Sequence, residues 1–420
     1  MPKQKRVILQ PEYLSRFSCI GAACEDSCCL GTWNIFVDKK TFLKYRDVGD
    51  PELQADIDRA VKRNRGENAS DEMYAKLGMF ATGGADCVLL GADKLCRIQS
   101  KLGGEYLCDV CALYPRIYKM AGRKIERCAT MSCPEAARMA LMNPNGLAFE
   151  SVDESPAVGR IPARVAMLNP DAPEFENRPL KYFWDVRMLC ILLLQDRSYT
   201  LGQRLIIIGM LCQKIDELDK AGRTADIPAM LEAFDADTED GALKPEFEQV
   251  GNNFHIQMRI AKELTDKRAS EGLDASVAYI KCLKETLVGL ECFSDTPAAQ
   301  VLDKYVENRE MYVIPYLKEK EYMLENFVVN EFFQRMMPFG YGETAWDSYL
   351  FMCVIYTMVK LHMNGMAGCH KGLTDEIVVK LVQAFSKVVL HNANFMSDMV
   401  KLLKDNGFNT LAWTAILVND

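Results

Sequence analysis

The sequence predicts a mainly α-helical protein in which an irregular, cysteine-rich N-terminal metal-binding module precedes a multi-helix C-terminal domain. Ten of the 16 cysteines lie between residues 19 and 133. A proline-rich stretch follows them, and beyond it apolar residues recur at helical spacing. A chain of 420 residues exceeds the ~250–300 residues at which single cores stop growing. We therefore expect a cysteine-rich module over 1–142, a surface connection over 143–180 and an all-helical domain over 181–420.

The period of the apolar residues predicts the helices. In LGQRLIIIGMLCQKI they are spaced alternately four and three residues apart, on one face of a helix: Leu201, Leu205, Ile208, Cys212 and Ile215. Cys212 is therefore expected to be a core residue. Similar windows follow at 253–269, 274–292, 297–310, 313–336, 344–363 and 374–404. The connection over 143–180 carries six prolines, which favour a path over the surface.

Local signals within the module are weaker. The stretch TWNIFVD over 32–38 alternates loosely and predicts a short strand. Asp38 is then placed to cap a helix that begins in KKTFLKYRDV.

Charge and hydropathy argue against several classes of function. A net charge of −8 does not suit a nucleic-acid binder, whose surface is usually basic. The longest apolar runs, MLCILLL and LIIIGMLC, fall far short of the ~20 residues of a membrane span. The opening MPKQKRVILQP lacks the apolar segment of a signal peptide. We therefore expect a cytoplasmic protein with no nucleic-acid or membrane partner, whose thiols stay reduced.

The cysteines of the module are spaced like metal ligands. Their pattern is Cys19-x4-Cys24-x3-Cys28-Cys29, then Cys87, Cys96, Cys108-x2-Cys111 and Cys128-x4-Cys133. Thiolates without histidine favour zinc or iron–sulfur over calcium, magnesium or manganese. Structural zinc usually takes two Cys-x2-Cys pairs, and only CDVC has that form. The spacing thus favours an iron–sulfur cluster, with zinc or simple structural and redox thiols as alternatives. Because one cluster takes four thiolates, several of these cysteines must be core residues.

These segments resemble a known motif family. CEDSCC, CVLL, KLCRIQ and CDVCALYPRI look like the cysteine-rich zinc- or iron-chelating motif, which ends in a cysteine shortly before Tyr-Pro. The match falls on Cys24, Cys28, Cys29, Cys87, Cys96 and Cys111, followed by Tyr114 and Pro115. Adding the other cysteine of the CDVC pair gives the candidate ligands Cys24, Cys28, Cys29, Cys87, Cys96, Cys108 and Cys111. Cys19 lies outside the motif.

A narrower resemblance extends over most of the chain. The blocks PEYLSRFSCIGAACEDSCCLGTWNIFVDKKTFLKY, LLLQDRSYTLGQRLIIIGMLC and YMLENFVVNEFFQRMMPFG resemble the flagellin lysine N-methylase family. The resemblance implies a cytoplasmic enzyme that methylates lysine ε-amino groups of flagellin. It also implies S-adenosylmethionine as the methyl donor and a [4Fe-4S] cluster on the cysteine motif.

Catalytic residues are harder to place than metal ligands. Lysine must react as the neutral amine, although its ordinary pKa is near ~10.4, and aromatic rings can hold the sulfonium donor. Asn330 and Glu331 lie in a family-like block, while Tyr341, Trp346 and Tyr349 are candidates for an aromatic cage. Packing residues are the alternative reading of these aromatics.

The donor site is not marked by any nucleotide-fold motif. No glycine-rich turn follows a clear strand, so the doubly wound fold is not supported. A cluster held by three thiolates would leave an iron free to bind the donor, and we take this as a hypothesis. In the C-terminal half, Cys353, His362, Cys369 and His370 match no common zinc spacing and are expected to be core or surface residues.

Two other classes of function remain open from the sequence. One is a zinc-stabilised helical interaction protein without catalysis. The other is an iron–sulfur protein of electron transfer or redox sensing. Both would use the same cysteines, so residue spacing does not separate them from a methyltransferase.

Overall fold

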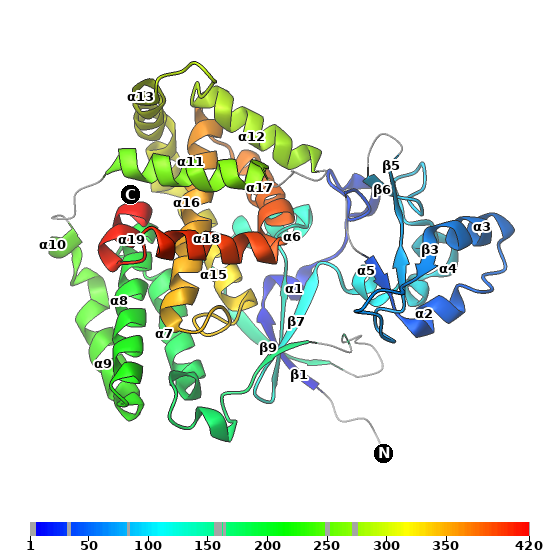
Figure 1. Ribbon diagram of the computed structural model, residues 1–420, viewed down its shortest axis with the longest axis horizontal. Helices are drawn as coiled ribbons and strands as arrows, with labels where there is room; N and C mark the ends of the chain where they lie inside the picture. The colour runs from blue at the N-terminus through cyan, green and yellow to red at the C-terminus, as the bar shows by residue number, and fades with distance from the viewer. Residues whose placement is uncertain are drawn as a thin grey trace.

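The molecule consists of a small lobe beside a larger helical mass (Figure 1). The computed structural model describes residues 6–31, 35–81, 85–154, 162, 165–247, 253–270 and 276–419. We call the described part of 19–113 the cysteine lobe and the remainder the helical body. The lobe appears in blue and cyan on one side of the body in Figure 1.

The cysteine lobe is built from short elements. Its strands form a three-stranded antiparallel sheet in the order β2-β4-β3 and a β5-β6 hairpin. Their bounds are β2 (Ile35–Val37), β3 (Val61–Arg63), β4 (Ala75–Leu77), β5 (Met79–Ala81) and β6 (Ala85–Cys87). The helices are the 3₁₀ turns η1 (Gly21–Ala23) and η2 (Gly104–Tyr106), with α2 (Lys39–Lys44), α3 (Pro51–Ala60), α4 (Arg97–Leu102) and α5 (Asp109–Leu113).

Two local predictions for this lobe are confirmed. The strand expected over 32–38 is β2, although residues 32–34 lie outside the described residues. Asp38 caps α2 as predicted, because its carboxylate accepts a hydrogen bond from the backbone N–H of Thr41 at 2.9 Å.

The helical body contains a five-stranded mixed sheet in the order β10-β7-β8-β1-β9. β1 pairs with β8 in parallel and with β9 in antiparallel fashion. The elements are β1 (Arg6–Pro11), α1 (Tyr13–Arg16), β7 (Arg116–Ala121), β8 (Lys124–Ala129), α6 (Pro134–Leu141), β9 (Phe149–Glu154) and β10 (Ala166–Leu168). The segment 143–180, expected as a surface connection, therefore supplies β9 and β10 to the sheet. The sequence of β9 is FESVDE, and all of its residues are half-buried or exposed. Most of them are polar, so no apolar alternation marks this strand in the sequence.

The cysteine lobe is inserted between β1–α1 and β7 of this sheet. The chain leaves the body after Phe17 and returns through the cis Tyr114–Pro115 peptide. At this junction the guanidinium of Arg116 lies 5.0 Å from the ring centre of Phe17. The entry and exit points of the lobe are thus in contact.

The rest of the body is helical, and the predicted mainly α class is confirmed. The α-helices are α7 (Phe183–Gln195), α8 (Leu201–Lys220), α9 (Ile227–Thr238), α10 (Lys244–Phe247), α11 (Phe254–Ser270), α12 (Val277–Gly289), α13 (Ala298–Asn308), α14 (Ile314–Lys320), α15 (Tyr322–Gln334), α16 (Ala345–His370), α17 (Asp375–Phe385), α18 (Ala393–Asp405) and α19 (Leu411–Val418). Two π-helical segments, η7 (Arg309–Val313) and η8 (Ser386–Leu390), and the 3₁₀ turns η3 (Pro173–Phe175), η4 (Pro179–Tyr182), η5 (Thr224–Asp226) and η6 (Glu239–Gly241) complete it.

Helix α16 runs through the centre of the body and packs against α8, α11, α12, α13, α17, α18 and α19. At the crossing with α12, a Cβ on Gly289 would come within 1.8 Å of the Gly365 carbonyl oxygen, so only glycine permits this approach. By length and composition α16 could cross a membrane, yet 94% of its most apolar window is buried inside the protein. Burial of that kind is typical of a core helix. The apolar face predicted for 201–215 is the buried face of α8, and Cys212 is a core residue as expected.

Two buried ion-pair systems join the elements of the body. Arg187 of α7 contacts Glu126 of β8 at 2.5 Å and donates to the Phe333 carbonyl of α15 at 2.7 Å. Glu325 of α15 accepts two hydrogen bonds at 2.9 Å from Arg197 and one at 2.7 Å from Arg204 of α8. These contacts fix the sheet and α8 onto α15, because hydrogen bonds between ionised groups are stronger than those between neutral groups, and the Arg197–Glu325 pair is also bidentate.

Candidate metal centre and active site

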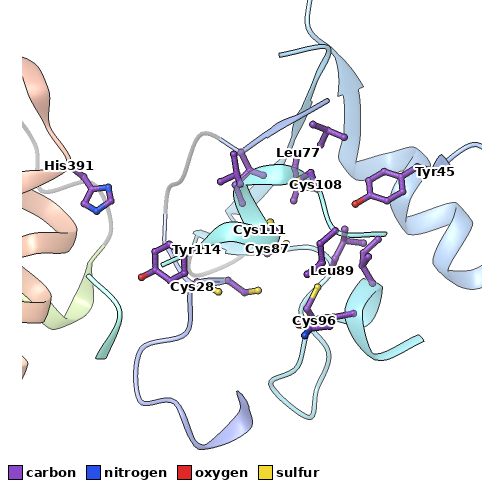
Figure 2. A pocket seen from close by; sticks show the side chains of 17 residues that line it. Cys28, Tyr45, Leu77, Cys87, Leu89, Cys96, Cys108, Cys111, Tyr114 and His391 are labelled. Atoms are coloured by element: carbon purple, nitrogen blue, oxygen red, sulfur yellow. The ribbon is translucent and has the colours of Figure 1, made fainter. Parts of the chain in front are cut away.

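The cysteine lobe encloses a cavity of about 220 Å³ lined by thiols. Six of the seven cysteines predicted as metal ligands contribute to its wall: Cys28, Cys29, Cys87, Cys96, Cys108 and Cys111. Figure 2 labels five of them, with Tyr45 at one end of the cavity and Tyr114 and His391 at the other. Most remaining wall residues are aliphatic. The sequence thus predicted a group of thiols that lie together in the fold, although the first and the last are more than 80 residues apart in the chain.

Short elements present these thiols. Cys28 and Cys29 lie in the turn after η1, and the Cys29 carbonyl accepts a hydrogen bond from the Cys87 backbone N–H at 2.8 Å. Cys96 and Cys108 are the N-cap residues of α4 and α5. Unpaired backbone N–H groups at such helix starts favour thiolate over thiol. Both α4 and α5 thus begin at a cysteine that is part of the cavity wall.

The thiols interact with one another. Hydrogen bonding to Cys29 lowers the pKa of Cys28 to about 7 and that of Cys96 to about 6. The same partner lowers the pKa of Cys87, while these contacts, first that of Cys28, raise the pKa of Cys29. Deprotonated sulfur is the form that binds metal. Cys29 therefore contacts Cys28, Cys87 and Cys96, and these contacts favour the thiolate form of its three partners.

A second pair lies in the same wall. Cys108 and Cys111 share a hydrogen bond that lowers the pKa of Cys108, whereas the same contact and burial raise the pKa of Cys111. The aromatic ring of Tyr45, whose hydroxyl donates to the Tyr106 carbonyl at 2.8 Å, closes this end of the cavity.

The donor chemistry of the cavity fits a soft metal or an iron–sulfur cluster. Its lining residues carry thiols but no carboxylate, and thiolates select zinc or iron–sulfur centres over hard cations. Among the residues that the structure describes, no three His, Cys, Asp or Glu side chains are grouped as for a single ion. The thiols are instead distributed around a cavity. The ligand set stays a prediction, and Cys28, Cys29, Cys87 and Cys96 are the residues we would assign to it first.

Cys24 is placed differently from the other predicted ligands. It follows η1, is about half-buried and is not part of the cavity wall. Burial is the main cause that raises its pKa. Cys19 is exposed, whereas Cys128 and Cys133 are buried in the body; burial raises the pKa of Cys133 to about 12.

The helical body contributes a polar end to the cavity that sequence reasoning missed. His391 lies just after η8, and its Nε2 is 3.1 Å from the hydroxyls of both Thr130 and Ser132. The Ser132 hydroxyl is also 3.2 Å from the hydroxyl of Tyr114. Burial, with help from Arg335 and Lys387, lowers the pKa of His391 to about 4. The imidazole is therefore neutral at physiological pH. No local pattern marks His391, because its partners lie some 260 residues earlier.

The residues named as catalytic candidates do not line this cavity. Asn330 is fully buried, accepts a hydrogen bond from Tyr13 at 2.8 Å and donates to the Ala129 carbonyl at 3.1 Å. Glu331 is also buried and pairs with Arg335 at 2.9 Å. Asn330 thus joins α15 to α1 and β8, while the Glu331 pair lies at the C-terminal end of α15 itself. Their catalytic assignment stays a prediction without support from these contacts.

The proposed aromatic cage is not assembled as one site. Trp346 and Tyr349 contact each other with ring centres 4.9 Å apart, and their polar atoms bond to Asn409 and Thr414. Tyr341 instead packs on Phe351 at 4.4 Å. These contacts are those of packing residues around α16.

The C-terminal cysteines and histidines behave as expected for core and surface positions. Cys353 and His362 are fully buried, and the His362 ring contacts Tyr279 and the Met358 carbonyl. Cys369 is partly exposed, and His370 lies 3.2 Å from Glu285.

The comparison that decides the family concerns the helical body. Residues 187–417 match the model of the FliB lysine N-methylase C-terminal domain, which is more than half of the chain. The chain belongs to the FliB lysine N-methylase family. The predicted resemblance and the predicted enzyme class, a protein-lysine N-methyltransferase, are thereby confirmed. The match includes His391 but not the cysteine lobe.

Relatives of this family extend the comparison to the N-terminal part. A lysine-N-methylase of Salmonella choleraesuis is 21% identical over 92% of both chains, and one of Salmonella typhimurium is 24% identical over 68% of both. The flagellar biosynthetic protein FliU of Salmonella muenchen is 30% identical, covering 34% of this chain and 81% of its own. No solved structure matches the chain.

Proposed function

We propose that this methyltransferase transfers the methyl group of S-adenosylmethionine to lysine ε-amino groups of flagellin in the cytoplasm, with a [4Fe-4S] cluster held in the cysteine lobe. The observation that carries the proposal is the shared cavity. Its thiol wall comes from the lobe, and its polar end includes His391 from the family's helical domain. The flagellar name of one relative supports flagellin as the substrate. The sixteen free cysteines agree with a reducing compartment.

The reaction requires a neutral lysine and an aligned donor. The lysine Nζ lone pair forms a bond to the methyl carbon as the carbon–sulfur bond breaks, which leaves S-adenosylhomocysteine and a methylammonium. The acceptor must lose its ammonium proton before attack, because that proton occupies the lone pair. Aliphatic walls disfavour the charged ammonium, so entry into the cavity itself promotes loss of the proton.

Protein groups at the polar end can orient the amine and receive its proton. Tyr114 and His391 line the cavity, and the hydroxyls of Ser132 and Thr130 hold the His391 ring at Nε2. The lowered pKa of His391 means that its neutral ring accepts hydrogen bonds without retaining a proton. The proton then passes along these hydroxyls to water.

The thiol wall would hold the cluster through Cys28, Cys29, Cys87 and Cys96, or three of them. A cluster held by three of these thiolates would leave one iron with open coordination, and that iron could take the amino and carboxylate groups of the donor. The remaining wall residues keep that end of the cavity apolar and exclude water.

Anaerobic purification followed by methyl transfer tests the proposal. We expect a brown protein with iron and sulfide, which transfers label from S-adenosylmethionine to flagellin. Flagellin with chemically acetylated lysines is the matched control and should take no label. A colourless protein with stoichiometric zinc contradicts the cluster. An iron–sulfur protein that leaves flagellin unlabelled contradicts the substrate and favours a redox role.

A further inference from the structure

The loop that carries Cys24, Cys28 and Cys29 is fastened to the helical body by the carboxylate of Asp26. One oxygen accepts from Lys387 Nζ at 2.6 Å, and the other accepts from Gln383 Nε2 at 2.8 Å. Gln383 also donates to the Ser132 carbonyl at 2.9 Å. Both carboxylate oxygens are thus bound by side chains of α17 and η8.

The Asp26–Lys387 pair is shielded from solvent. The side chains of Asp26 and Lys387 are 14% and 6% exposed, whereas the neighbouring pair of Glu25 and Arg138 is 53% and 37% exposed. Exposed pairs contribute little because water and salt screen them. The fastening of this loop therefore depends mainly on Asp26.

The same contact connects the two walls of the cavity. Cys28 follows Asp26 by two positions and belongs to the thiol wall, while His391 follows Lys387 by four positions and belongs to the polar end. A shift of this contact would move one wall relative to the other.

We propose that Asp26 is a positioning residue for methyl transfer: through Lys387 and Gln383 it sets the distance between the thiol wall and the end formed by Tyr114 and His391. This inference rests on the proposed function, in which the donor lies at the first wall and the lysine at the second. Misplacement of reacting groups by about 1 Å can cost on the order of 10²-fold in rate. We call the contact of Asp26 with Lys387 and Gln383 the clamp. The clamp thus acts on the alignment of the donor with the lysine and leaves the affinity for either substrate unchanged.

The test compares Asp26→Asn with Asp375→Asn in the full-length, cluster-loaded protein. Asp375 pairs with Lys320 at 2.9 Å and is not part of the cavity wall, so its variant controls for loss of one partly buried ion pair. We expect Asp26→Asn to lower kcat roughly 10- to 100-fold, with donor Kd and iron content within about twofold of wild type. Asp375→Asn should leave all three near wild type.

Hydrogen exchange on the protein as purified gives a readout that does not depend on activity. Asp26→Asn should increase deuterium uptake in 25–30 and 386–390, and Asp375→Asn should not. Unchanged uptake, or increased uptake with wild-type kcat, overturns the inference. A wild-type protein that neither loads iron nor methylates flagellin contradicts the proposed function instead, and the exchange comparison still decides whether the clamp exists.

The double variant Asp26→Asn/Lys387→Met covers the case in which Asp26→Asn alone does not fold. It removes the buried cation together with its carboxylate partner. Because the pair acts as a unit, the loss in kcat of the double variant should be close to the loss in one single variant, not to the product of both. A folded double variant with wild-type kcat overturns the inference.

Discussion

The cysteine lobe and the helical body are held together in different ways. The body has one extensive apolar core around α16, a helix of 26 residues. The strands of the lobe have three residues each, and its small core includes the thiols of Cys87 and Cys108. Of the residues that would bind the metal, Cys87 is therefore also a core residue of the lobe, and Cys29 and Cys96 pack against that core.

Under the proposed function, metal binding and folding are linked in the lobe and not in the body. Small units with little apolar core commonly need a metal to fold, and their binding free energy is then folding free energy. The helical body can depend on apolar burial alone, since that term grows with the size of the core. Substitutions of the same type should consequently have unlike effects in the two regions.

Loss of a cavity thiol should give the largest effect. We expect Cys96→Ser to remove most bound iron and to lower methyl transfer more than ~100-fold. The groups that surround the ligands cannot replace a ligand that is lost. Cys212→Ala, in the core of α8, should keep the iron and most activity, at a cost of about 1 kcal/mol in stability. Iron analysis and labelled-methyl transfer measure both. Full iron loading of Cys96→Ser would remove this thiol from the ligand set.

Loss of a buried carboxylate in the body should rank second. Glu325→Gln removes the anion that Arg197 and Arg204 share, while Arg204 keeps its pair with Glu321. Loss of hydrogen bonds to a charged group costs about 1.5–3 kcal/mol. The comparable pair in the lobe, Asp56 with Arg97, is 17% and 19% exposed, so Asp56→Asn should cost about 1 kcal/mol or less. Urea unfolding monitored by circular dichroism compares the two. Equal losses would mean that burial does not separate these pairs.

Acid should weaken the body before it weakens the lobe. Burial lowers the pKa of His362 to about 4, below the ~6.5 of an unfolded chain, so the unfolded state takes up the proton first. The stability from the neutral ring is complete above pH ~6.5 and is lost as the pH falls toward ~4.

Between pH 7 and pH 5 this loss amounts to about 2 kcal/mol for one such histidine. The pKa of His391 is also lowered, but His391 is exposed and solvent screening reduces its contribution, so His362→Leu should remove most of the pH dependence caused by these two groups. The lobe contains no histidine and lacks this term. Urea unfolding at both pH values is the measurement, and an unchanged slope in His362→Leu would contradict the assignment.

Helix caps should give the smallest effects, and equal ones. Asp38 caps α2 in the lobe and Thr374 caps α17 in the body, each by accepting a backbone N–H bond. Replacement by alanine should cost about 1 kcal/mol at either site. Melting curves of the two variants test this. Clearly unequal losses of stability would mean that the two regions differ in their local structure as well as in their cores.

The sequence predicted what short-range periodicity and distinctive residue chemistry can encode. The helices of the body, the Asp38 cap and the core position of Cys212 follow from spacing within a few turns. Six cavity cysteines were found because thiols clustered at ligand spacing are rare in ordinary cores. Their assignment to a particular metal stays a prediction.

Long-range pairing was beyond such reasoning. β1 lies against β8, although Ile8 and its partner Ile125 are separated by more than a hundred residues, and the polar β9 carries no apolar alternation. His391 reaches the cavity through hydroxyls from the other half of the chain. Neither feature leaves a signal in neighbouring residues, so tertiary structure was needed to find them.

The contact between Phe17 and Arg116 has a consequence for how such a protein can change. Because the lobe begins and ends at one point of the body, it can be lengthened, shortened or exchanged as a cassette while the surrounding sheet keeps its register. Selection on donor chemistry and selection on the acceptor protein can then act on separate stretches of the gene. Residues that contact the body from within the lobe, such as Asp26, must then vary together with their partners in the body.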